Sequence, residues 1–151
     1  MAPWGAARER VAALVDSNIL VYRHDPRDES KQRIATDLLR RGIAERSLRI
    51  PHQAILEFVA AVTRPVGGGA PLLAIDEARR EAEEMLLQFD VIYPSEPLVR
   101  LALRGSAAYQ LPWFDAHLWA FAELNGLEEL ISEDFQDGRL YGTVRVRNPF
   151  A

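Results

Sequence analysis

Five short apolar runs recur along the chain, separated by longer segments that mix apolar and polar residues. Short apolar runs bounded by polar residues or proline are typical of buried strands. The intervening segments carry apolar residues at helical spacing, and we predict helices there. The predicted strands are Val11–Val15, Leu48–Ile50, Val91–Tyr93, Leu130–Ser132 and Val144–Val146, and the predicted helices cover 19–23, 30–41, 53–63, 76–89, 95–109 and 112–124.

Strands that alternate with helices predict an α/β fold. We expect a central, mainly parallel sheet of about five strands with helices on both faces. The strand at 11–15 is expected at the centre, and the strand at 144–146 at an edge. Ser30 and Asp76 are the predicted N-caps of their helices.

The 151 residues indicate one domain over 11–151, preceded by a leader at 1–10. There is no cysteine, no apolar run long enough for a membrane span and no secretory signal pattern, so we expect a cytoplasmic protein without disulfides or membrane segments. The net charge of −4 argues weakly against a nucleic-acid partner. If a metal ion held four carboxylates, however, the whole acidic excess would be accounted for.

Four acids are predicted to lie where the fold brings its elements to one edge. Asp16 ends the first strand and Asp134 follows the fourth, while Glu57 and Asp115 lie in the first turns of helices. The carboxyl ends of parallel strands form the edge at which α/β proteins bind ligands. Each acid alone has an ordinary explanation, as a helix cap, a helix-dipole partner, a turn residue or a solvated side chain. Four carboxylates together repel one another, and a divalent cation removes that repulsion.

The ligand types restrict the metal. Without cysteine, and with three histidines (His24, His52 and His117) that lack metal-ligand spacing, the donors are mostly oxygens. Oxygen donors favour hard cations such as Mg²⁺, Mn²⁺ or Ca²⁺.

Four segments, taken in order, resemble the motifs of PIN-domain nucleases. They are Val15-Asp16-Ser17-Asn18-Ile19-Leu20, Gln53-Ala54-Ile55-Leu56-Glu57-Phe58-Val59, Trp113-Phe114-Asp115-Ala116 and Leu130-Ile131-Ser132-Glu133-Asp134-Phe135. The closing Val144-Arg145-Val146-Arg147-Asn148-Pro149-Phe150 is similar to the end of many VapC-type toxins of bacterial toxin–antitoxin modules. The resemblance covers roughly residues 11 to 150 and implies a PIN-like fold.

The resemblance implies an endoribonuclease that uses Mg²⁺ or Mn²⁺ to hydrolyse RNA phosphodiester bonds by water attack. Asp16, Glu57, Asp115 and Asp134 would then be the catalytic metal ligands, and Asn18 and Ser132 would hold them in place. Asp137 is a reserve ligand, whereas Glu133 is interpreted as a solvated neighbour. A VapB-like antitoxin and a homodimer are implied by the resemblance alone.

The sequence leaves open which residues contact the substrate. Arg23, His24, Lys31, Arg64 and Arg104 are candidates for RNA phosphates, against the alternative of an ordinary solvated surface. Of Trp113 and Phe114, one is expected to anchor its helix in the core and the other to stack on a base. His117 either faces the acids or packs.

Two other functions are weighed against the nuclease. One is a PIN-like binding or regulatory module that has lost catalysis, which the presence of all four acids disfavours. The other is an aspartyl phosphotransferase with Asp16 as nucleophile, which usually needs a second acid two residues later, where this chain has Asn18.

Overall fold

The strand β1 (Ala13–Val15) lies in the middle of the molecule and divides its core into two parts. Ala13 and Val15 face one hydrophobic cluster and Leu14 the other, as the two-residue period of a strand requires. All three side chains are buried. The computed structural model describes residues 12–151, so the expected leader at 1–10 and the predicted strand position Val11 lie outside the described residues.

The sheet has six strands in the order β3-β2-β1-β4-β6-β5. The neighbours of β1 are β2 (Leu48–Pro51) and β4 (Glu129–Ile131), and β3 (Asp90–Ile92) and β6 (Val144–Arg147) flank these, all parallel. The predicted mainly parallel sheet with a central first strand is therefore confirmed. Its edge is different, because β5 (Leu140–Tyr141) pairs antiparallel with β6 and covers it. Residues 144–146 are thus one strand in from the edge.

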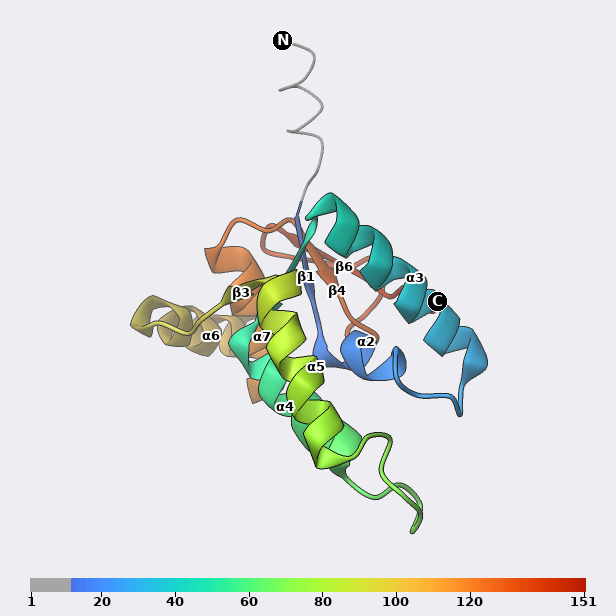
Figure 1. The fold of residues 1–151 in the computed structure, drawn as a ribbon. Coiled ribbons are helices and arrows are strands. Elements are labelled where there is room, and N and C mark those ends of the chain that lie inside the picture. Colours follow the sequence, from blue (N-terminus) through green and yellow to red (C-terminus); the bar gives the residue numbers. More distant parts are fainter. Residues whose placement is uncertain (1–11) are drawn as a thin grey trace.

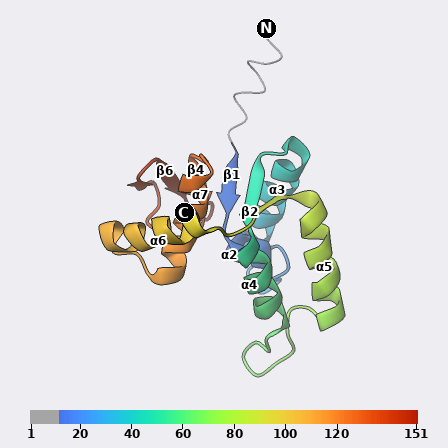
Figure 2. The same ribbon diagram turned by 90° about the vertical axis from the view of Figure 1, so that its left-hand side faces the viewer.

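Helices cover both faces of the sheet, as predicted (Figures 1 and 2). On one face lie α2 (Ser17–Tyr22), α3 (Glu29–Glu45), α4 (His52–Thr63) and α5 (Ile75–Gln88). On the other lie α6 (Glu96–Tyr109) and α7 (Trp113–Leu124), which pack against each other. Nowhere in residues 12–151 is there a helix both long and apolar enough to cross a membrane.

Two predicted N-caps are wrong. The helix α3 begins at Glu29, and Asp28 caps it by accepting a hydrogen bond from the Lys31 backbone N–H at 3.1 Å. In α5 the N-cap is Ala74, whose backbone N–H donates to the Glu77 carboxylate at 3.0 Å, and Asp76 lies in the first turn. Asp28 and Ser30 are both good capping residues, so composition alone does not choose between them.

At two glycines a helix lies unusually close to a neighbouring side chain. Gly42 lies inside α3 against the Leu48 side chain, and Gly105 in α6 lies against the Trp119 ring. A Cβ atom would come to 2.2 Å from the Leu48 side chain and to 2.3 Å from the Trp119 ring, so the missing side chain of glycine allows the close approach. Gly42 therefore serves packing, and α3 continues past it to Glu45.

Candidate active site

The carboxylate of Asp16 begins the site, because it is buried at the carboxyl end of the central strand and caps α2. Its side chain is only 6% exposed. Oδ1 accepts from the Ser17 backbone N–H at 2.7 Å, and Oδ2 accepts from the Ser132 hydroxyl at 2.6 Å. The two explanations of Asp16, as helix cap and as site residue, are therefore both consistent with its position.

Asp134 is held beside Asp16 by two neighbouring polar groups. Its backbone N–H donates to the Ser132 hydroxyl oxygen at 3.1 Å. The Asn18 amide nitrogen donates to Asp16 Oδ2 at 3.3 Å and to Asp134 Oδ2 at 3.1 Å. Asn18 and Ser132 thus connect two acids that are 118 positions apart in the sequence, in the way that the sequence predicts for residues that hold them.

Glu57 and Asp115 complete the group from two helices, one on each face of the sheet. The Ser17 hydroxyl donates to Glu57 Oε1 at 3.0 Å and connects α4 to the start of α2. Asp115 lies in the first turn of α7 and is half-buried. The charges of Asp134 and Glu57 both act on the Asp115 carboxyl. The structure therefore brings together all four acids that the sequence places at this edge.

The environment disfavours the ionised form of two of the four acids, Asp16 and Asp115. Burial, together with the charges of Asp134 and Glu57, raises the pKa of Asp16 to about 7, against the hydrogen bonds from Ser132 and Ser17 that lower it. Burial and the same two charges raise the pKa of Asp115. Within residues 12–151, none of the four acids forms an ion pair with lysine, arginine or histidine.

The donor set fits a hard divalent cation in its chemistry, with four carboxylates and the buried amide oxygen of Asn18, which has no hydrogen-bond partner in the described chain. The arrangement is nevertheless open. Among residues 12–151, no three acidic or histidine side chains stand close enough to hold one ion. A bound cation would therefore require at least one of these side chains to move inward.

The other acids of the fourth motif have structural partners. Asp137 Oδ1 accepts from the Asn148 backbone N–H at 2.8 Å and ties down the segment after β6. Glu133 is not simply solvated, as the sequence suggested, because it accepts from the Tyr22 hydroxyl at 2.8 Å and from Lys31 Nζ at 3.3 Å. The Tyr22 ring in turn packs edge-on against Phe150.

Sequence reasoning missed this contact network of Tyr22, Lys31, Glu133 and Phe150, which joins α2, α3, the loop after β4 and the end of the chain. It also assigned no role to Ser17, although Ser17 lies within the first motif. The position of Ser17 directly after Asp16 was an available signal. No sequence pattern marks Tyr22 and Glu133 as partners.

The aromatic residues before Asp115 differ from the expectation that one of them anchors the helix. Trp113 is 42% exposed and Phe114 is 70% exposed, so neither lies in the core. Trp119 is the residue of this helix that anchors it in the core, and its ring nitrogen donates to the Tyr141 carbonyl at 3.0 Å. His117 packs on the Trp113 ring, and its Nδ1 lies 3.1 Å from the Trp113 carbonyl oxygen.

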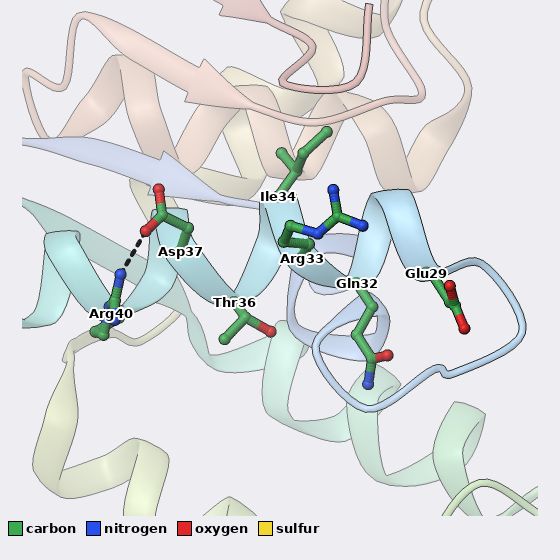
Figure 3. A pocket seen from close by; sticks show the side chains of 7 residues that line it. All are labelled: Glu29, Gln32, Arg33, Ile34, Thr36, Asp37 and Arg40. Carbon is green, nitrogen blue, oxygen red and sulfur yellow. Dashed lines mark hydrogen bonds and ion pairs between the residues drawn. The ribbon is translucent and has the colours of Figure 1, made fainter.

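A hollow along α3 contains none of the four acids Asp16, Glu57, Asp115 and Asp134. Figure 3 shows its lining side chains, which leave one helix in several directions and do not converge on a common point. Asp37 and Arg40 form an exposed ion pair there. This hollow offers no chemistry comparable with the acid cluster.

A model of a protein family matches most of the sequence. The model of the PIN domain matches residues 13–139, which is most of the chain. This protein belongs to the PIN domain family. The PIN resemblance of the sequence motifs is thereby confirmed. A comparison with curated protein sequences found no match.

Solved structures share the PIN fold of this chain. A toxin–antitoxin complex from Klebsiella pneumoniae contains a chain with 22% identity and a TM-score of 0.66, and the match covers 91% of this chain and 98% of that one. A DNA-bound VapBC complex from Salmonella typhimurium gives 10% identity and a TM-score of 0.67, covering 92% and 98%. VapC20 of Mycobacterium tuberculosis, described as a toxin that cleaves the sarcin–ricin loop, gives 13% identity and a TM-score of 0.59, covering 79% and 87%.

Proposed function

We propose that this PIN-domain protein is a metal-dependent endoribonuclease and the toxin of a toxin–antitoxin module. The observation that carries the proposal is the convergence of Asp16, Glu57, Asp115 and Asp134 with no basic partner among residues 12–151. In such a group Asp16 and Asp115 are costly to keep ionised unless a cation joins them. The similarity in fold to toxin–antitoxin complexes and to an RNA-cleaving toxin supports the assignment.

Mg²⁺ or Mn²⁺ is the proposed cofactor. Asp16 and Asp134 would be its fixed ligands, and Glu57, whose side chain is exposed, and Asp115 would complete the set. When bound, the ion supplies a water of lowered pKa and neutralises charge on the phosphodiester. The role of the chain's own hydroxyl and amide groups is to hold carboxylates. Ser132 and Asn18 orient Asp16 and Asp134, and Ser17 orients Glu57.

The raised pKa of Asp16 makes metal binding dependent on pH. Because the metal-free carboxyl has a pKa of about 7, binding at lower pH requires release of a proton. Affinity for Mn²⁺ should therefore fall as the pH drops below 7.

The test is cleavage of total cellular RNA by the purified protein with Mn²⁺ or Mg²⁺, and with EDTA. We expect metal-dependent cleavage that Asp16→Asn abolishes and that Asp115→Asn reduces strongly. Asp76→Asn is the matched control, because Asp76 is an exposed acid in the first turn of α5. Absence of cleavage together with absence of Mn²⁺ binding by calorimetry would instead favour a PIN-like binding module.

The proposed partners are a VapB-like antitoxin and a second copy of the chain. Exposed apolar side chains, which include Leu56, Val99 and Leu103, offer contact area for association. Light scattering during gel filtration measures the oligomeric state, and a monomer at micromolar concentration would contradict the dimer. An antitoxin encoded beside the gene should suppress the RNA cleavage when it is co-purified.

A further inference from the structure

A groove between α2 and α4 starts at the acid cluster and leads away from it. It has a volume of about 470 Å³, which is within the range of pockets that hold small ligands. Ser17, Asn18 and Glu57 line the end that belongs to the acid cluster. The groove is therefore continuous with the proposed catalytic group.

One stripe of α4 forms a wall of the groove. Glu57, Ala60, Ala61 and Arg64 line it, at positions i, i+3, i+4 and i+7 of one helical face. Seven residues of helix span about 10 Å. The two alanines in the middle of the stripe keep the groove wide, and Arg64, the C-cap of the helix, ends it.

The opposite wall combines an apolar and an aromatic side chain with a second arginine. Val21 and Tyr22 line it on α2, and Arg27 follows in the next turn. Arg27 is held by Asp25, with two guanidinium–carboxylate contacts at 2.8 and 2.7 Å. No ion pair to Arg64 is found among the described residues, and its side chain is exposed.

We propose that this groove binds one nucleotide of single-stranded RNA next to the scissile phosphate, with Arg64 holding the neighbouring phosphate. The inference rests on the proposed nuclease function. A cation at the acids and a guanidinium at the other end both bind phosphate. A nucleic-acid backbone is a ligand that carries one phosphate per nucleotide and could occupy both positions. Val21 and Tyr22 supply apolar and aromatic surface for the ribose and base between them.

The other arginine and lysine candidates are not in the groove. Lys31 bonds to Tyr22 and Glu133, Arg23 is half-buried near Glu81 and Glu84, and His24 packs on Phe58. Arg104 lines a separate hollow on α6. Of the five phosphate candidates that the sequence offers, only Arg64 lies along the groove.

The experiment measures fluorescence anisotropy of a labelled, mixed-sequence single-stranded RNA with the full chain in EDTA, over a range of KCl concentrations. Arg64→Gln removes the guanidinium, and Ala60→Leu fills the groove from an exposed position. The matched controls are Arg100→Gln and Ala107→Leu, because both residues are exposed on α6. Arg64→Lys tests whether a positive charge alone restores binding.

We expect Arg64→Gln to weaken RNA binding about threefold to tenfold and to reduce the slope of log K against log[KCl] by about 0.7, the value for one phosphate contact on a single strand. Ala60→Leu should weaken binding with the slope unchanged, and Arg64→Lys should keep the slope. The controls should match the wild type.

Unchanged affinity and slope in both groove variants would overturn the proposal, and this is also the result expected if the groove serves a polypeptide. Wild-type protein that binds no RNA even at low salt would overturn it too. Because binding is measured without metal, the two proposals fail separately. RNA binding through the groove without cleavage in Mn²⁺ contradicts only the nuclease, and cleavage with unaltered groove variants contradicts only the groove.

Discussion

The four acids form two pairs that differ in how they are held. Asp16 and Asp134 follow neighbouring parallel strands and share the Ser132 hydroxyl and the Asn18 amide. Glu57 and Asp115 come from helices on opposite faces of the sheet, and their one side-chain hydrogen bond within the described chain is that from Ser17 to Glu57. The sheet pair is preorganised, whereas the helix pair is adjustable.

The difference suggests a division of roles. Preorganised ligands lose little freedom when an ion binds, and so they set affinity. In the proposed metal site, adjustable ligands would allow the coordination to change as substrate enters. The open arrangement, in which no three acids of residues 12–151 are in place to hold one ion, is consistent with this division.

The largest difference should appear when one acid of each pair is neutralised. We expect Asp16→Asn to lower RNA cleavage by more than about 1,000-fold and Glu57→Gln by about 10- to 100-fold, because the fixed ligand has no replacement. Initial rates at saturating Mn²⁺ measure both. Equal losses in the two variants would mean that the pairs do not differ in function.

The serine hydroxyl groups that donate hydrogen bonds to the two pairs, Ser132 and Ser17, provide a finer test. Ser132→Ala removes the group that contacts both Asp16 and Asp134, and we expect Mn²⁺ affinity to fall about 10- to 100-fold. Ser17→Ala removes the contact to the exposed Glu57 and a long 3.4 Å contact to Asp16 Oδ1, and it should cost only a few-fold. Calorimetric titration with Mn²⁺ measures the two, and a larger effect at Ser17 would reverse the comparison.

The pH dependence of the free energy of unfolding should show how costly it is to ionise the buried Asp16 of the sheet pair. The folded pKa of Asp16, about 7, lies above its unfolded value of 3.8, so between these values the folded state binds more protons. Stability from this group is present below pH 3.8 and is lost as the pH rises to 7. In EDTA, wild type should lose about 2 to 3 kcal/mol relative to Asp16→Asn between pH 5 and 8. Thermal unfolding of both at several pH values measures the difference, which should be absent for Asp76→Asn.

The smallest effect is expected for the contact network of Tyr22, Lys31, Glu133 and Phe150, which holds the Asp134 loop from outside. Glu133→Gln keeps the size of the side chain and weakens its contacts to Tyr22 and Lys31, so cleavage should fall about threefold with little change in stability. Steady-state rates and melting temperature measure the two effects. A loss of Mn²⁺ affinity in Glu133→Gln as large as that expected for Ser132→Ala, measured by the same calorimetric titration, would place Glu133 inside the proposed metal site.

The convergence of the four acids was more predictable than several details of the fold. Asp16, Glu57, Asp115 and Asp134 could be predicted because parallel strands bring their carboxyl ends, and the helices that follow them, to one edge. The partners of Glu133 could not be predicted, because its contacts come from α2 and α3, about 100 or more positions away.

Other misses have local causes. Leu140–Tyr141 is too short to give a pattern of its own, and it becomes a strand only because β6 lies beside it. The apolar spacing of α4 would also allow Leu56 on the buried face, but Leu56 is 58% exposed, since Ala54, Phe58 and Val62 form that face. Helix periodicity tolerates either choice, and packing decides between them.

The pairing of β1 with β4 also has a consequence for synthesis. Ala13 pairs with Glu129, and the hydrogen bonds from Asn18 to Asp134 and from Ser132 to Asp16 each span 116 positions. Contacts of such long range form late in folding, and a chain on the ribosome cannot make them before its fourth strand has emerged. A nascent chain therefore carries Asp16, Glu57 and Asp115 without an assembled site, and the proposed ribonuclease stays silent while it is being made.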